Sequence, residues 1–159
     1  MPRATKWPTK PIFNLYRDWS IDSGNASASE PLCARIERTR VDAVVHAFYD
    51  KLRAHPEMSG FFSHIEDFAQ HEQHIAVFWW WAMGGRAERQ RPFDMNGRHQ
   101  PLGLTEQAFA QWLVIFRETL HEQLPPELSE AWFDLAQGIG ANLQRMMLEG
   151  KRPFILERL

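Results

Sequence analysis

The sequence predicts one all-α domain with four principal helices. Its 159 residues suffice for a single domain with a sizeable core. Four segments carry apolar residues at intervals of three and four, which is the spacing of one helix face. No alternating strand pattern and no internal repeat occurs in the sequence. These observations favour helices packed on helices.

The first 30 residues are predicted to be an N-terminal extension and linker. They contain Pro2, Pro8 and Pro11 and end in a run of small and polar residues from Ser23 to Ser29, a composition that breaks regular structure. We therefore expect the domain to occupy residues 31–150, followed by a tail at 151–159. Four aromatic residues leave open whether the extension packs on the domain or is a free arm: Trp7, Phe13, Tyr16 and Trp19.

The first half of the domain is predicted to hold two principal helices. After a short helix over residues 31–38, Thr39 and Asp42 resemble a capping box that opens the first. Ser63 and Glu66 open the second in the same way, and Gly84-Gly85 ends it. The inward face of the first comprises Val41, Val44, Val45, Phe48, Tyr49 and Leu52, and that of the second comprises Phe68, His71, Ile75, Phe78, Trp79 and Ala82.

Two further helices follow a polar stretch that reaches His99-Gln100-Pro101, which we expect to be loop with at most a short helix. Thr105 starts the third principal helix and Pro125-Pro126 stops it. Gly150 ends the fourth. Their inward residues are Phe109, Trp112, Leu113, Phe116 and Leu120, then Leu128, Trp132, Leu135, Ile139, Leu143 and Met146.

The apolar face of the second helix contains His71, which is therefore expected to face the interior. A histidine in such a position is more often a hydrogen-bonded core residue than a functional one. Tyr49 and Trp112 lie on the inward faces of the neighbouring helices. Buried phenol and indole groups need hydrogen-bond partners, so these three side chains either satisfy one another or face a bound ligand.

A second candidate is His99, which lies in a loop where most histidines are simply exposed. A b-type haem needs one neutral imidazole on its proximal side and a distal pocket on the other. His99 and the group around His71 divide in that way. Because the sequence contains no Cys-x-x-Cys-His, any haem would be held non-covalently.

Other metal and nucleotide sites are disfavoured. His71-Glu72-Gln73-His74 places its second histidine one residue too early for the zinc-protease motif. Glu118-Thr119-Leu120-His121 has the spacing of di-iron bundles but occurs only once. There is no pair of cysteines for zinc, no phosphate-binding loop and no Gly-x-Ser-x-Gly motif.

Charge, cysteine content and hydropathy narrow the possible binding partners and the cellular location. A formal net charge of -2 disfavours nucleic acid and anionic membrane surfaces. The single cysteine, Cys33, and the lack of a signal-like start favour a cytoplasmic location. The longest apolar run, Ile75 to Met83, is about half of the ~20 residues needed to cross a bilayer, so no membrane span is expected.

Three segments together resemble the group III truncated haemoglobins of bacteria. The resemblance covers about residues 32–148 and depends on the order and approximate spacing of Tyr, His, Phe-Trp, His and Trp. The family has no standard counterpart to residues 1–30, and the stretch 85–98 is longer than usual. The segments are Phe48–Leu52, His71–Trp79, and His99–Leu102 leading to Phe109–Leu113.

This resemblance implies a globin-like two-over-two helical sandwich around one haem b (iron protoporphyrin IX). It implies that His99 is the proximal iron ligand. The distal polar residues would be Tyr49, His71 and Trp112, and the apolar wall would consist of Phe48, Phe62, Ile75, Phe78 and Trp79. His74 and Arg98 would pair with the haem propionates, although a solvated surface role suits them equally.

Three functions follow as alternatives. The first is binding of O2, NO or CO, with redox chemistry on the ligand, such as nitric oxide dioxygenation or peroxide turnover, as a lesser option that would need a reductase. The second is a six-coordinate redox or sensor protein in which His71 also binds the iron. The third is a haem-free helical binding module. The sequence makes no prediction of the oligomeric state.

Overall fold

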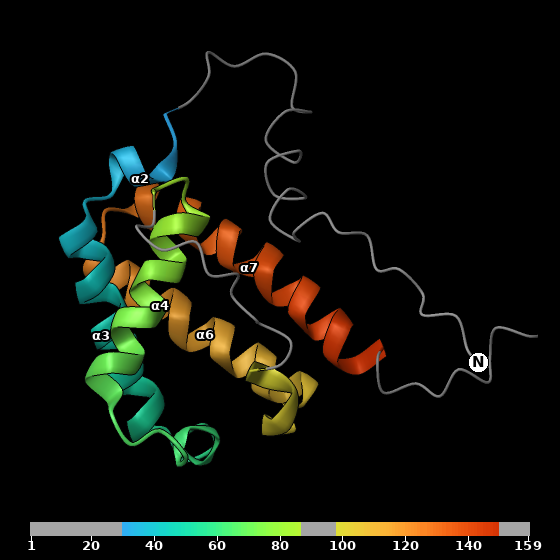
Figure 1. Ribbon diagram of the computed structural model, residues 1–159. Helices are drawn as coiled ribbons and strands as arrows, with labels where there is room; N and C mark the ends of the chain where they lie inside the picture. The colour runs from blue at the N-terminus through green and yellow to red at the C-terminus, as the bar shows by residue number, and fades with distance from the viewer. Residues whose placement is uncertain (1–29, 87–97, 150–159) are drawn as a thin grey trace, which may run out of the picture.

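The computed structural model describes residues 30–86 and 98–149, and all regular secondary structure in this part of the chain is helical (Figure 1). The predicted four principal helices are confirmed. They are α3 (Arg38–Ala54), α4 (Phe68–Ala82), α6 (Glu106–Gln123) and α7 (Pro126–Glu149), and the shorter elements are α2 (Leu32–Arg35), η1 (Ser59–Phe62) and η2 (Gln100–Leu102). The predicted extension, except Glu30, and the predicted tail lie outside the described residues.

The four long helices form two packed pairs. Helix α3 packs against α4, and α6 packs against α7, while α3 also contacts α6 and so joins the pairs. Figure 1 shows α3 and α4 side by side, with α7 as the long helix that extends away from them. Helix α2 contacts α7. The short connection between α6 and α7, residues 124–125, places these two helices next to each other.

The two predicted starts in the first half of the domain are wrong. Helix α3 follows Glu37, whose extended backbone (φ -66, ψ 148) makes it the cap, so Thr39 lies inside the helix. Helix α4 follows Asp67, whose carboxylate accepts the Gln70 N–H at 3.0 Å. Ser63 has helical backbone angles (φ -63, ψ -22) and cannot take the extended form of an N-cap.

Other boundaries agree more closely with the sequence. The helix predicted over residues 31–38 is shorter, because Ile36 is extended and separates α2 from α3. Thr105 caps α6 as predicted, accepting the Ala108 N–H at 3.1 Å. Gly84 adopts φ 97 after α4, a conformation that glycine takes without strain. Pro126 is the first residue of α7, where its missing N–H costs nothing.

Aromatic rings from all four long helices fill the core. Phe116 lies at its centre, with ring centroids of Trp112 at 5.0 Å, Trp79 at 5.3 Å, Phe48 at 4.9 Å and Trp132 at 5.8 Å. Trp132 is fully buried, and its Nε1 has no hydrogen-bond partner. Packed rings of this size bury much apolar surface each. The inward faces predicted from the sequence therefore meet in one cluster.

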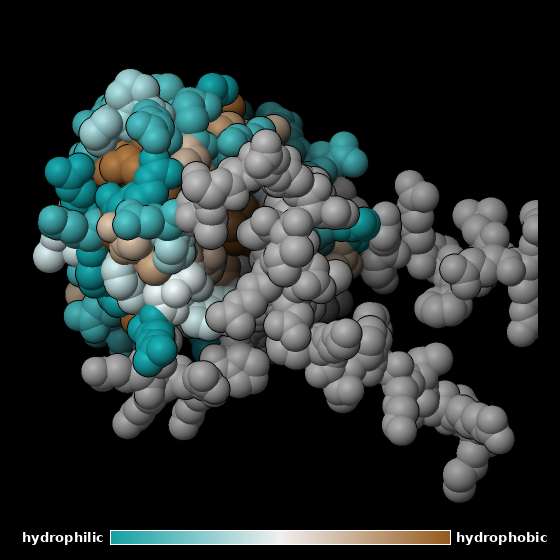
Figure 2. All heavy atoms as spheres, turned by 90° about the horizontal axis from the view of Figure 1, so that it is seen from above, coloured by the Kyte–Doolittle hydropathy of each residue, from teal (hydrophilic) through white to brown (hydrophobic). Residues whose placement is uncertain are grey.

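Polar side chains cover most of the outside. Figure 2 shows a largely hydrophilic surface with a few hydrophobic patches over the described part. Among the described residues, Val114 is the only large hydrophobic side chain that is mostly exposed, at 54%. None of the helices that the structure describes is both long and apolar enough to span a membrane.

Candidate functional site

A hydrogen bond between Tyr49 and His71 joins α3 to α4. Tyr49 Oη lies 3.1 Å from His71 Nε2, and the two rings meet edge to face with centroids 5.1 Å apart. The Phe62 ring also meets Tyr49 edge to face, with ring centroids 5.6 Å apart. The structure thus brings together three of the predicted site residues, which lie far apart in the sequence.

Both partners of this hydrogen bond are held neutral. Burial, reinforced by the nearby Glu72 carboxylate, raises the pKa of the Tyr49 hydroxyl well above its usual range. Burial is also the main reason why the pKa of His71 is lowered. At neutral pH the phenol keeps its proton and the imidazole carries one. The Tyr49 hydroxyl donates to Nε2 when the imidazole proton is on Nδ1.

The third predicted polar residue, Trp112, does not contact the hydrogen-bonded pair of Tyr49 and His71 directly. Phe48 separates it from Tyr49, with ring centroids 5.8 Å from Tyr49 and 5.2 Å from Trp112. Within the described residues, we find no ring contact or hydrogen bond that joins Trp112 to Tyr49 or His71. Its half-buried indole instead stacks on Phe116. The predicted convergence of three polar groups is therefore only partly formed.

The predicted apolar wall is buried beside this group. Phe48, Phe78 and Trp79 are at most 4% exposed, and Ile75 is half-buried and packs against the same cluster. Phe78 and Trp79 contact each other with ring centroids 5.3 Å apart. Phe48, which contacts the Tyr49 ring, belongs to this buried cluster.

Three further histidines and one arginine lie near His71. His64, His74, Arg98 and His99 each act on it electrostatically and, after burial, lower its pKa. His99 is half-buried and lies in a short helical segment directly before η2, whereas His74 and Arg98 are exposed. The loop candidate His99 and the helix candidate His71 therefore border one region. His64 was missed, because nothing in its local sequence distinguishes it from a solvated histidine.

The residues in this region fit a haem chemically. A half-buried imidazole can bind iron, and an aromatic wall can enclose a porphyrin. In residues 30–86 and 98–149, no ion pair joins His64, His74 or Arg98 to a carboxylate. The guanidinium of Arg98 is a donor that suits a propionate group.

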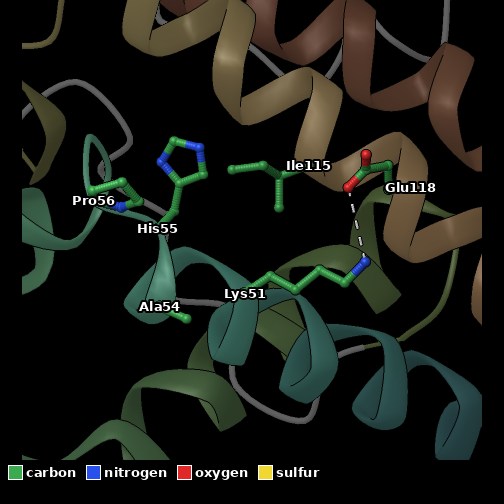
Figure 3. A pocket seen from close by; sticks show the side chains of 6 residues that line it. All are labelled: Lys51, Ala54, His55, Pro56, Ile115 and Glu118. Carbon is green, nitrogen blue, oxygen red and sulfur yellow. Dashed lines mark ion pairs between the residues drawn. The ribbon is translucent and has the colours of Figure 1, made fainter.

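A separate groove of about 320 Å³ lies between the end of α3 and α6 (Figure 3). Lys51, His55 and Ile115 line it, and the Lys51 ammonium lies 3.9 Å from Glu118. Lys51 follows Tyr49 by two residues, which turns it about 200° around the helix axis. The groove therefore opens on another face of α3, and it contains none of the predicted site residues.

The fold and this set of residues define a haem-binding globin of the truncated kind. Residues 37–142 match the model of the bacterial-like globin family, and the chain belongs to that family. No curated protein sequence gives a significant match to the chain.

A solved structure supports the two-over-two architecture. The chain is similar to the 2/2 haemoglobin from Synechococcus sp. PCC 7002, solved in the cyanomet state and with covalently attached haem. The two are 27% identical with a TM-score of 0.62, and the match covers 75% of this chain and 98% of the cyanobacterial one. The fold class expected from the sequence is confirmed.

Proposed function

We propose that this protein is a group III truncated haemoglobin that holds one haem b non-covalently through His99 and binds O2, NO or CO on the opposite face. The observation that carries the proposal is the hydrogen bond between Tyr49 and His71 in an aromatic interior, in a region that His99 also borders. The order of Tyr, His, Phe-Trp, His and Trp in the sequence supports the group III assignment.

When bound, the haem would supply an iron that takes a diatomic ligand. The neutral imidazole of His99 is the proposed protein ligand to that iron. On the other side, the Tyr49 hydroxyl keeps its proton and can donate a hydrogen bond into the pocket. The Trp112 indole is the second proposed donor. His71 either shares the Tyr49 proton or turns aside as a gate.

The rest of the chain has supporting roles in this proposal. Phe48, Phe62, Ile75, Phe78 and Trp79 form the wall that keeps water out. His74 and Arg98, together with His64, pair with the propionates. We propose that the globin domain occupies residues 31–150, that the protein is cytoplasmic, and that redox turnover of the bound ligand, where it occurs, draws electrons from a reductase.

Absorption spectra of the purified ferrous and ferric protein test the proposal against a six-coordinate haem. His71 Nε2 is engaged by Tyr49, so we expect a five-coordinate ferrous form that binds CO rapidly. A bis-imidazole spectrum that persists in His71→Ala would contradict the proposed role of His99 as the one protein ligand. A bis-imidazole spectrum that His71→Ala abolishes would show that His71 binds iron.

Extraction into acidified organic solvent tests the mode of attachment. The similar cyanobacterial protein was solved with covalently attached haem, whereas we propose a non-covalent haem here. All of the haem should leave the denatured chain, and the mass of the polypeptide should equal that of its sequence. A chain that keeps the mass of the haem would refute this part of the proposal.

A further inference from the structure

A second cluster of potential ligands lies at the outer edge of the seam between α3 and α4. His46 and Asp50 lie one turn apart on α3, and Glu72 reaches them from α4. His46 Nδ1 is 2.9 Å from Glu72 Oε2, and His46 Nε2 is 3.5 Å from Asp50 Oδ2. One ligand atom from each residue lies within 4.8 Å of the others.

We propose that His46, Asp50 and Glu72 form a binding site for a divalent transition metal ion such as Zn²⁺. One imidazole nitrogen and two carboxylate oxygens are donors that zinc accepts, at bond lengths of about 2.0–2.2 Å. Bonds of that length place neighbouring ligand atoms roughly 3–4 Å apart in a tetrahedral site. Because only one His46 nitrogen can bind a given ion, the relevant measure is that one ligand atom from each residue lies within 4.8 Å of the others. Small side-chain rotations close the remaining gap of about 1 Å, and solvent can supply the fourth ligand.

Charge favours a cation at this position. A neutral imidazole has only one N–H, so it can satisfy only one of the two carboxylates that face it. Even with a protonated His46 the cluster keeps a net negative charge. A metal ion satisfies both carboxylates at once. Glu72 is only 15% exposed in its side chain, whereas His46 and Asp50 are 66% and 57% exposed, so an ion can reach the cluster from solvent.

The position of this cluster connects it to the haem side of the seam. Asp50 directly follows Tyr49, and Glu72 directly follows His71. A bound ion would therefore link α3 to α4 at the level of the hydrogen bond between Tyr49 and His71. It would hold together the two helices that form the proposed distal pocket.

Titration calorimetry of the untagged, haem-loaded protein with ZnCl₂ tests the site. The natural protein should bind one ion at this site, and His46→Ala and Glu72→Gln should weaken that binding at least ~10-fold, about 1.4 kcal/mol. The matched control is His121→Ala. His121 also pairs with a carboxylate, Glu130, at 2.7 Å, but Arg117 rather than a second acid completes that cluster.

His46→Ala changes an exposed histidine, and Glu72→Gln lies at the seam between α3 and α4. An unchanged haem spectrum will show that each variant is folded. Zinc-edge anomalous diffraction from crystals soaked in Zn²⁺ should place a peak between His46, Asp50 and Glu72. The proposal is overturned if the natural protein shows no saturable binding, if His46→Ala binds as tightly as the natural protein, or if the peak lies elsewhere. Neither readout depends on the identity of the iron ligand.

Discussion

A single hydrogen atom lies between Tyr49 Oη and His71 Nε2. Burial disfavours both the phenolate and the imidazolium, so the contact is a hydrogen bond between neutral groups. In surroundings of low polarity such a bond is stronger than in water, and it fixes the direction of the hydroxyl. A ligand that enters the pocket can compete with His71 for that hydrogen.

Replacing Tyr49 with Phe removes this donor and keeps the ring. One hydrogen bond contributes about 0.5–1.5 kcal/mol net, so dissociation of O2 from the ferrous protein should become up to ~10-fold faster. Stopped-flow measurement of the dissociation rate checks this. Trp81→Phe, which alters an aromatic side chain near the end of α4 outside the proposed pocket, should leave the rate unchanged. Equal rates for Tyr49→Phe and the natural protein would exclude Tyr49 as a donor.

Local sequence patterns predicted which segments are helical better than they predicted the first residue of each helix. Thr105 is a cap because its backbone is extended and its hydroxyl reaches the Ala108 N–H. Ser63, followed by Glu66, has the fuller capping signal in the sequence, but its hydroxyl donates to the Gly60 carbonyl in the preceding turn. The choice between Ser63 and Asp67 depends on how the chain turns after η1. A window of four residues does not contain that information.

A pair of threonine variants tests the revised helix starts. Thr105→Ala removes a side-chain cap and should lower the free energy of unfolding by about 1 kcal/mol. Thr39→Ala changes an exposed residue inside α3 and should alter stability by less than about 0.5 kcal/mol. Urea denaturation of both variants measures the difference. If Thr39→Ala were the more damaging, the capping box predicted from the sequence would be correct after all.

The end of α4 depends on a glycine that makes room for Trp80. A Cβ at Gly85 would lie 2.4 Å from Trp80 Nε1, so Gly85→Ala must displace the indole and should lower stability by about 1–3 kcal/mol. Gly60→Ala is the matched control, because nothing lies within 4 Å of its added Cβ. Thermal unfolding should show a lower Tm for Gly85→Ala only. An unchanged Tm would mean that Trp80 does not pack over Gly85.

At the scale of the whole molecule, the proposed site draws on three long helices and the short helical segment that contains His99. Sequence periodicity predicted which residues face inward, because each helix buries one stripe. It could not show that Phe48 separates Trp112 from Tyr49, since that depends on how α3 and α6 meet. Nor could it pair His46 with Glu72, which come together only when α3 packs on α4.

Removal of the haem should destabilise the entire domain. A ligand that binds only the folded state stabilises it by about 4 kcal/mol when its free concentration is 1,000 times Kd. Haem-free protein should therefore unfold at a clearly lower Tm, and added haem should restore the original value. Calorimetry of both forms measures this. Identical Tm values would indicate that the aromatic core is complete without a porphyrin.

The most direct test of the central claim is the haem content of His99→Gly, purified in parallel with His121→Ala. His121 is an exposed histidine on α6 and has no role in the proposed haem site. We predict that His99→Gly loses its haem or its natural ferrous spectrum, that added imidazole restores that spectrum, and that His121→Ala is unaffected. If His99→Gly retains haem with an unchanged iron spectrum, His99 is not the ligand and the proposed orientation of the pocket is wrong.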